Sequence, residues 1–192
     1  MRGPEANHEV EGELMKTRPS ILVLGHARAG KDTVAEILTR DQGMRCASTS
    51  AAAAQIVRLA LAEEGIHYDS SEACFADRVN HRSEWFDIIA DLNSADPATL
   101  VRHILSDHDV VVGLRSAREF EAAAPLLDAI WWVDSSGRGV PPEPTSSMDI
   151  VFDPSRMTRI DNGGSLADLE RNVASAMADA WISLADRFER AA

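Results

Sequence analysis

The sequence predicts an α/β fold with three layers, in which helices cover both faces of a mostly parallel sheet of about five strands. Largely apolar runs at 21–24, 109–114 and 129–134 lack the alternation of half-exposed strands, which indicates strands buried on both faces. Amphipathic segments alternate with these runs along the chain. A turn containing two glycines joins the first run directly to the helix that follows it.

Composition agrees with one domain at 20–192 after a polar leader at 1–19 that we expect to be disordered. The 192 residues are 45% hydrophobic, enough for a sizeable core, and no run reaches the roughly 20 apolar residues that span a membrane. The net charge of −12 disfavours a general affinity for DNA or anionic membranes. Cys46 and Cys74 form neither a metal-ligand pattern nor a disulfide framework, which fits a reducing cytoplasm.

In the first half of the chain, helical spacing of Val34, Ile37 and Leu38 predicts a helix that starts directly after the glycine turn. Asp96-Pro97 is typical of an N-cap and first turn. The stretch at 66–81 is less regular. The expected elements are a strand at 21–24, a helix at 31–40, a strand at 44–49 and helices at 51–64, 83–92 and 97–106.

In the second half, Ser165 followed three residues later by Asp168 indicates a capping box at the start of the last helix. Residues 135–149 are rich in Pro, Gly and Ser and are expected to form a mobile loop. The expected elements are strands at 109–114, 129–134 and 157–161 and helices at 116–127 and about 165–190. The inner face of the last helix is expected to carry Leu166, Leu169, Val173, Met177 and Ala180.

The stretch "GHARAGKDT" at 25–33 has the spacing of a phosphate-binding loop, with four residues between two glycines and a lysine directly after the second. Glycines let the backbone wrap around a phosphate chain, and the N-terminus of the following helix favours negative charge. Lys31 is expected to bridge the β- and γ-phosphates. An ordinary glycine turn with a surface lysine is the alternative. The expected nucleotide-binding residues here are Gly25, His26, Ala27, Arg28, Ala29, Gly30, Lys31, Asp32 and Thr33.

Asp32 departs from the usual pattern, in which Ser or Thr follows the lysine and binds Mg²⁺. Its carboxylate would serve the metal directly or through water, or it simply favours the first turn of the helix. Thr33 remains available for the α-phosphate. Many P-loop enzymes end a neighbouring strand in an acidic residue, but Gly113 stands there. We therefore hypothesise that the metal-binding carboxylate has moved to Asp32.

The loop "GHARAGKDTVAEIL" resembles that of the phage-type deoxynucleoside monophosphate kinases, and animal-type phosphomevalonate kinases carry a similar Gly-Lys-Asp loop. The segments "VVVGLRSAREFEAA", "IWWVDSS" and "RIDNGGSLADLERNV" look like the same group. The resemblance covers most of 20–178 and is weakest at 66–106, where an acceptor-binding helical insert is expected. It implies a kinase that uses ATP and Mg²⁺, with a deoxynucleoside monophosphate as the favoured acceptor.

Arg115, at the end of the strand 109–114, is expected to contact a phosphate, because ligands of α/β sheets bind at this edge. A surface arginine is the alternative. With Lys31 and Asp32 it makes up the expected catalytic set. The role of Glu119 is left open between a function in the site and a helix cap, since Ser116 and Glu119 have the spacing of a capping box.

The expected acceptor site lies in "ADRVNHRSEWFD" at 76–87. On a helix, Arg78 and Arg82 would lie four residues apart on one face and clamp an acceptor phosphate. His81 is either a general base or a surface histidine, and Trp85 continues an apolar stripe, which favours core packing over stacking on a base. Carboxylates that could orient an acceptor hydroxyl are left unranked: Asp77, Glu84 and Asp87.

Arg138, as a substrate-binding residue, and Asn162, as a nucleotide-binding residue, complete the expected site. Arg138 lies in the short lid-like loop 135–149, and kinases of this kind close arginine-bearing lids over the phosphates. Asn162 and Gly163 follow the last strand, where related kinases wrap the adenine. The alternative for Asn-Gly is a plain turn.

Two other functions remain open. The first is a phage-type DNA-modification kinase that phosphorylates a hydroxymethylated base, such as 5-hydroxymethyluracil, in DNA. The excess of 31 acidic over 19 basic residues argues mildly against such a polymer. The second is a P-loop NTPase or nucleotide-binding regulator that is not a kinase. The expected partners are ATP and a nucleotide acceptor, with no membrane and with DNA only under the first alternative.

Overall fold

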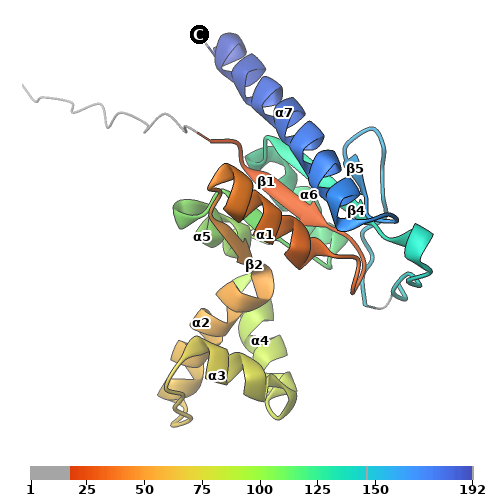
Figure 1. Ribbon diagram of the computed structural model, residues 1–192. Helices are drawn as coiled ribbons and strands as arrows, with labels where there is room; N and C mark the ends of the chain where they lie inside the picture. The colour runs from red at the N-terminus through yellow and green to blue at the C-terminus, as the bar shows by residue number, and fades with distance from the viewer. Residues whose placement is uncertain (1–17, 146, 192) are drawn as a thin grey trace, which may run out of the picture.

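The computed structural model describes residues 18–145 and 147–191, so residues 1–17 of the leader expected at 1–19 lie outside the described residues. Five parallel strands form one sheet in the order β2-β3-β1-β4-β5, with helices on both faces (Figure 1). The strands are β1 (Ile21–Leu24), β2 (Cys46–Ser48), β3 (Val110–Val112), β4 (Ala129–Asp134) and β5 (Thr158–Asp161). The predicted α/β class with about five strands is confirmed.

β1 is the centre of the sheet, which explains its unbroken apolar sequence. Leu22 pairs with Val111 of β3 on one side and with Ile130 of β4 on the other. All four residues of β1 are fully buried. The chain goes from β1 to one half of the sheet and later returns to the other half. The carboxyl end of β1 is therefore a switch point, where ligands of open α/β sheets bind.

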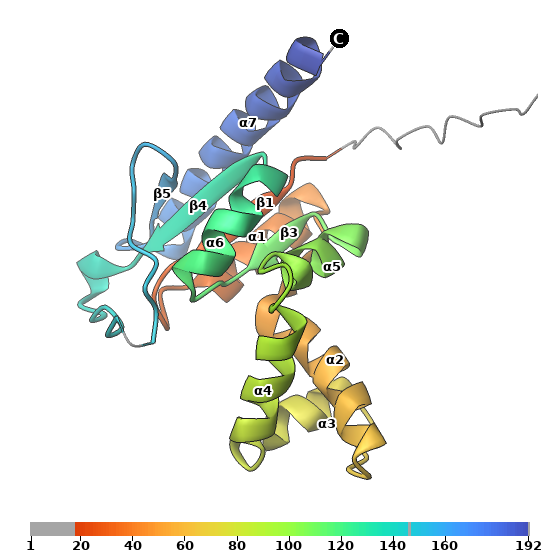
Figure 2. The same cartoon turned by 180° about the vertical axis from the view of Figure 1, so that it is seen from behind.

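Helices α1 (Lys31–Gln42) and α7 (Leu166–Ala191) cover one face of the sheet (Figure 1). The opposite face carries α5 (Thr99–Asp107) and α6 (Ala117–Ala123), which a 3₁₀ turn, η2 (Ala124–Leu126), extends (Figure 2). Proline at 125 explains why α6 ends before the expected 127, since proline cannot donate the helical hydrogen bond. The expected inner face of α7 is buried except for Leu166, which lies in the first turn and is 56% exposed.

A helical unit leaves the sheet directly after β2 and projects from the body (Figures 1 and 2). It contains α2 (Thr49–Glu63), α3 (Ser71–Ala76), the 3₁₀ turn η1 (Asp77–Val79) and α4 (Arg82–Leu92). Val57, Leu61 and Cys74 form its own small core. The unit thus differs from the expected insert at 66–106, because it includes α2 whereas α5 packs on the sheet through Val101 and Ile104.

The helix starts confirm one expected cap and correct another. The backbone N–H of Ser165 donates to Asp168 Oδ2 at 2.9 Å, and that of Asp168 donates to Ser165 Oγ at 3.3 Å, so the capping box is formed. Asp96 instead makes a turn before α5, in which its Oδ1 accepts from the N–H of Ala98 at 2.9 Å. The helix therefore begins at Thr99, two residues after the expected start.

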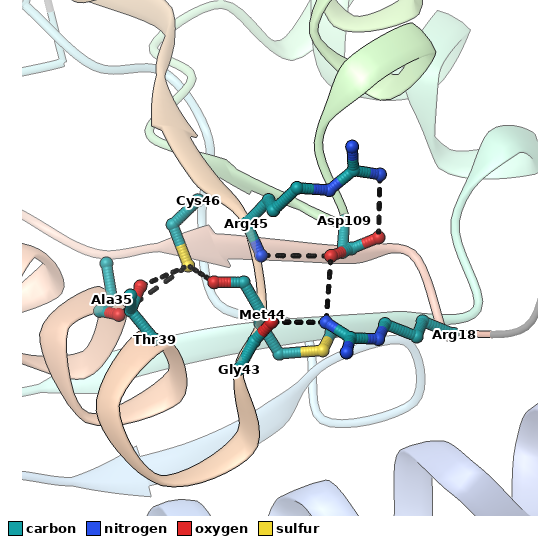
Figure 3. A network of polar contacts seen from close by, with 8 residues as sticks. All are labelled: Arg18, Ala35, Thr39, Gly43, Met44, Arg45, Cys46 and Asp109. Atoms are coloured by element: carbon teal, nitrogen blue, oxygen red, sulfur yellow. Dashed lines mark hydrogen bonds and ion pairs between the residues drawn. The ribbon is translucent and has the colours of Figure 1, made fainter.

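The fold begins earlier than the expected residue 20. Pro19 is buried, and the guanidinium of Arg18 donates to the carbonyl of Gly43 (Figure 3). The same guanidinium lies 3.6 Å from the buried carboxylate of Asp109, which also accepts from the backbone N–H of Arg45 at 2.9 Å. These contacts join Arg18 to the amino edge of the sheet.

Both cysteines are free thiols that serve packing. Cys46 Sγ lies 3.5 Å from the carbonyl oxygen of Ala35 and 3.5 Å from Thr39 Oγ1 (Figure 3). Burial raises the pKa of Cys46 and of Cys74, so both stay protonated and unreactive near neutral pH. Within the described residues, no helix is long and apolar enough to cross a membrane.

Candidate active site

The loop at 25–30 between β1 and α1 has a backbone that requires its two glycines. Gly25 has φ +143°, and a Cβ there would lie 2.6 Å from the carbonyl oxygen of Val133. Gly30 has φ +99°, and a Cβ there would lie 2.2 Å from Asn162 Nδ2. Arg28 has φ +61°, the one positive φ at a non-glycine residue in the described ranges. The loop is therefore tightly wound, and neighbouring residues of the chain after β1, Val133 and Asn162, leave no room for a side chain at its two glycines.

Asn162 holds the loop directly. It is 5% exposed, and its side-chain amide donates to the carbonyl of Ala29 at 2.7 Å. Arg138 ends a 3₁₀ turn, η3 (Ser136–Arg138), and its Nη2 lies 3.4 Å and 3.5 Å from the carbonyl oxygens of Arg28 and Ala29. Both side chains thus contact the loop itself. A predicted role of Asn162 beside adenine or of Arg138 in a lid stays a prediction.

A cavity of about 420 Å³ lies between this loop and the helical unit. Its wall brings together basic residues from three separate stretches of the sequence: Arg28 and Lys31, Arg78, and Arg115. Three hydroxyl residues at the start of α2, Ser48, Thr49 and Ser50, also line it. The acidic side chains in the wall are Asp32 and Glu143. The predicted loop, the predicted strand-end arginine and one predicted acceptor residue therefore share one site.

Lys31 is placed at the mouth of the loop by the first turn of α1. Its Nζ donates to the carbonyl oxygens of Gly25 and His26, each at 2.8 Å. Burial lowers the pKa of Lys31 from its usual value, and the nearby carboxylate of Glu143 opposes this shift. The lysine is a half-buried cation inside the cavity, as a phosphate-binding lysine requires.

Glu143 is a site residue that the sequence did not reveal, as are the three hydroxyl residues at the start of α2. Its Oε1 accepts from Arg115 Nη1 at 2.5 Å, and its Oε2 accepts from the backbone N–H of Ala27 at 2.6 Å. Its own backbone N–H donates to His26 Nδ1 at 3.2 Å. The only signal in the sequence was its place in "PPEP", which by itself indicates a stiff turn.

The predicted metal-binding role of Asp32 stays a prediction. Asp32 lies in the first turn of α1 and lines the cavity beside Lys31, and its carboxylate makes no hydrogen bond to any described residue. Gly113 indeed follows β3, with φ +83°, so no carboxylate ends that strand. In the described residues there is no group of three or more side chains that could hold a metal. Asp32 with phosphate oxygens and water would fit Mg²⁺, which usually keeps most of its water.

The expected arginine clamp is wrong in its geometry. Arg78 lies in η1 and lines the cavity, with its guanidinium carbon 4.0 Å from the centre of the Phe75 ring. Arg82 begins α4 after the chain bends at Asn80 and His81, and its exposed side chain lies outside the cavity wall. The two arginines therefore do not share a helix face.

His81 and Glu84 also lie outside the cavity wall. The ring nitrogens of His81 lie 3.5 Å from the carboxylate of Asp77 and 3.4 Å from that of Glu84. Trp85 packs into the core of the helical unit and forms an edge contact with Phe75, as its place in an apolar stripe predicts. In this arrangement, Arg78 is the residue of 76–87 that lines the cavity.

Glu119 does not cap α6. Ser116 at the N-cap makes no side-chain hydrogen bond to the helix, and Glu119 instead accepts from Asn93 Nδ2 at 2.9 Å. Burial raises the pKa of Glu119. Asn93 is 7% exposed, and its Oδ1 has no partner among the described residues. The pair joins the end of α4 to α6 at the cost of a poorly solvated carboxylate.

Glu119→Gln is expected to raise the melting temperature near neutral pH. Because the folded pKa of Glu119 is raised, the folded state binds more protons than the unfolded state between the usual and the raised pKa, and wild-type stability falls as pH rises through this window. Glutamine does not ionise, so it removes this pH-dependent loss of stability, and its amide can donate to Asn93 Oδ1. Melting temperatures of both proteins from about pH 4 to 8 measure the difference.

Glu121→Gln is the matched control for that experiment. Hydrogen bonds from Arg156 lower the pKa of Glu121. Its replacement should therefore cause a small decrease in melting temperature at pH values above the usual glutamate pKa. The account of Glu119 is wrong if the two variants shift the melting temperature in the same direction.

Searches with the sequence find no matching protein family and no matching curated protein. Among solved structures, TT1252 from Thermus thermophilus is similar with a TM-score of 0.50 and 19% identity, over 84% of this chain and 98% of that one. A gluconokinase from Sinorhizobium meliloti 1021 gives a TM-score of 0.49, 18% identity and coverage of 91% and 98%. A sugar kinase from Janibacter sp. HTCC2649 gives a TM-score of 0.42 and 14% identity, over 87% of this chain and 98% of that one.

At these identities the likeness concerns the fold alone. The parallel sheet with β1 at its centre and the glycine loop that leads into α1 define a P-loop α/β fold. The comparisons do not reach the phage-type subtype that the sequence resembles.

Proposed function

We propose that this chain is an ATP-dependent kinase that transfers the γ-phosphate to a nucleotide acceptor, with a deoxynucleoside monophosphate as the first choice. The observation that carries the proposal is the convergence of the phosphate loop, Lys31, Arg115 and Arg78 on one cavity. Phosphoryl transfer mainly requires aligned reactants and positive charge around the moving group. A cavity with four basic residues at the end of a P-loop supplies positive charge, and its place between the loop and the helical unit would bring donor and acceptor together.

The donor phosphates fit the P-loop side of the cavity. The backbone N–H of Ala27 and the N-terminus of α1 would hold the β-phosphate, and Lys31 and Arg115 would flank the γ-phosphate. Asp32 would hold Mg²⁺ directly or through water, and the ion would neutralise charge on the phosphates. Thr33, in the same helical turn, would bind the α-phosphate.

The acceptor fits the side of the helical unit. Arg78 is pre-oriented by its stacking on Phe75, and a planar guanidinium held in this way is suited to an acceptor phosphate. The hydroxyls of Ser48, Thr49 and Ser50 at the start of α2 add polar contacts on the same wall. A phosphorylated acceptor is therefore favoured over a neutral one.

Arg78→Ala is expected to raise the acceptor KM by about tenfold or more, with little change in ATP affinity, because a charged hydrogen bond to a phosphate is lost. Arg82→Ala should change the acceptor KM less, since this side chain lies outside the cavity wall. Arg171→Ala, which removes an exposed ion pair on α7, is the control. Steady-state kinetics with each substrate varied in turn measures all three. A collapse of ATP affinity in Arg78→Ala would place this residue in the donor site instead.

The acceptor class is tested by following ADP formation with ATP, Mg²⁺ and a panel of acceptors. The panel holds deoxynucleoside monophosphates, sugar acids and duplex DNA with 5-hydroxymethyluracil. Turnover of a monophosphate should change only modestly with salt, whereas DNA binding would fall with a log–log slope of about −0.9 for each phosphate contacted. Labelling of modified DNA, with no turnover of any monophosphate, would overturn the mononucleotide proposal and favour the DNA kinase.

A further inference from the structure

We infer that Glu143 is an internal anion that occupies the phosphate site of the P-loop, so that a nucleotide must displace it to bind. The inference rests on the P-loop being the phosphate site of the proposed function. It adds an autoinhibitory contact made by the chain itself, from the connection between β4 and β5.

Both oxygens of the Glu143 carboxylate are bound as phosphate oxygens would be. Oε2 accepts from the backbone N–H of Ala27, inside the loop, at 2.6 Å. Oε1 accepts from the guanidinium of Arg115 at 2.5 Å. A backbone N–H of the loop and a strand-end arginine are the donors that a P-loop offers to a phosphate group. A carboxylate and a phosphate cannot use these two donors at the same time.

The charge around Glu143 fits this role. Its side chain is 15% exposed, whereas that of Arg115 is 61% exposed, so the carboxylate is the inner member of the pair. Burial alone would raise the pKa of Glu143, but the hydrogen bonds from Arg115 and Ala27 and the charges of Arg115 and Lys31 bring it below its ordinary value. The carboxylate is therefore ionised at neutral pH and offsets part of the positive charge of the site.

The segment that carries Glu143 is suited to act as a plug. Prolines at 141, 142 and 144 flank the glutamate and fix the backbone on both sides of it. The backbone N–H of Glu143 is bound to His26 Nδ1, so the main chain as well as the side chain is attached to the loop. Glu143 lines the 420 Å³ cavity and also a second cavity of about 520 Å³, which His26 lines as well. It stands in the wall between the two.

The functional consequence is a reduced apparent affinity for any phosphate ligand. If only a fraction of the molecules has an open loop, the dissociation constant rises by the inverse of that fraction. Removing the competing charge should therefore strengthen binding, whereas removing an ordinary binding residue weakens it. This opposite sign distinguishes a plug from a contact to the nucleotide.

The test is isothermal titration of pyrophosphate into the wild type, Glu143→Gln and Glu143→Ala, with Glu121→Gln as a control for the loss of a surface carboxylate. We expect both Glu143 variants to bind pyrophosphate about tenfold more tightly than the wild type, as for a loop that is about nine-tenths closed. Equal or weaker binding by both variants overturns the inference. If no protein in the series binds pyrophosphate, the assignment of the phosphate site itself fails. That result is distinct from equal binding by all variants, which contradicts only the role of Glu143.

Hydrogen exchange gives a second readout that does not depend on a variant. In the wild type, pyrophosphate should slow exchange at 26–31 and speed exchange at 139–145, because the plug leaves as the ligand enters. In a lid that closes over the ligand, both segments would exchange more slowly. That result would contradict the displacement of Glu143.

Discussion

Lys31→Ala is expected to lower turnover by about a hundredfold or more while the protein stays folded. The ammonium of Lys31 lies at the mouth of the P-loop, bound to the carbonyls of Gly25 and His26, and its stem lines the cavity instead of the core. Under the proposed function, its loss removes positive charge from the place where negative charge moves during transfer, and it leaves the apolar core unchanged. Steady-state kinetics and a thermal melt on the same preparation measure both parts of this expectation.

Arg40→Ala is the control for Lys31→Ala. Arg40 is a cation on the same helix, α1, but it is exposed and paired with Asp41 and Glu170. Its loss should leave turnover within a few-fold of the wild type, because an exposed ion pair contributes little. Turnover of Lys31→Ala within the same range would contradict the assignment of the P-loop.

Gly30→Ala is expected to abolish nucleotide binding and to destabilise the fold. Alanine at φ +99° is strained, which alone costs about 1–3 kcal/mol, and its Cβ would lie 2.2 Å from Asn162 Nδ2. The amide of Asn162 cannot move aside without losing its hydrogen bond to the carbonyl of Ala29. The loop must then change shape, and its N–H groups no longer converge on a phosphate. Denaturant unfolding and nucleotide titration measure the two effects.

Gly65→Ala separates the two causes. Gly65 also has a positive φ, +88°, but an added Cβ there has no neighbour within 4 Å, so this variant reports the backbone strain alone. The double variant Gly30→Ala with Asn162→Ala removes the clash and keeps the strain, so it should be less destabilised than the sum of its single variants. Equal destabilisation by Gly30→Ala and Gly65→Ala would show that Asn162 does not constrain the loop.

The parts of the site that could be predicted are those with a local signal. The central strand is revealed by its buried apolar run, and the loop by two glycines whose spacing is fixed by the path of the backbone. Lys31 follows from its place directly after the second glycine, and Arg115 from the rule that ligands bind at the carboxyl ends of parallel strands. These residues are placed by elements that are short and close in sequence.

The parts that could not be predicted depend on distant segments. Glu143 reaches Ala27 across 116 positions of sequence, and Asn162 reaches Ala29 across 133. The Ser116–Glu119 spacing predicts a cap, but the buried amide of Asn93 binds the carboxylate instead. The helical clamp of Arg78 and Arg82 failed because the chain bends between them, where no proline or glycine marks a break. Local patterns do not contain such tertiary contacts.

The most direct test of the proposed function is the dependence of ADP formation on an acceptor. Wild-type protein with ATP and Mg²⁺ is assayed with and without a mixture of deoxynucleoside monophosphates, with Lys31→Ala as the background. The account predicts slow ADP release without acceptor and an increase of about a hundredfold or more with it, since the bound acceptor completes the aligned site. Deoxynucleoside diphosphate should form in the same amount as the additional ADP. Equal ADP release in both samples, with inorganic phosphate as the product, would contradict the kinase and indicate a P-loop NTPase.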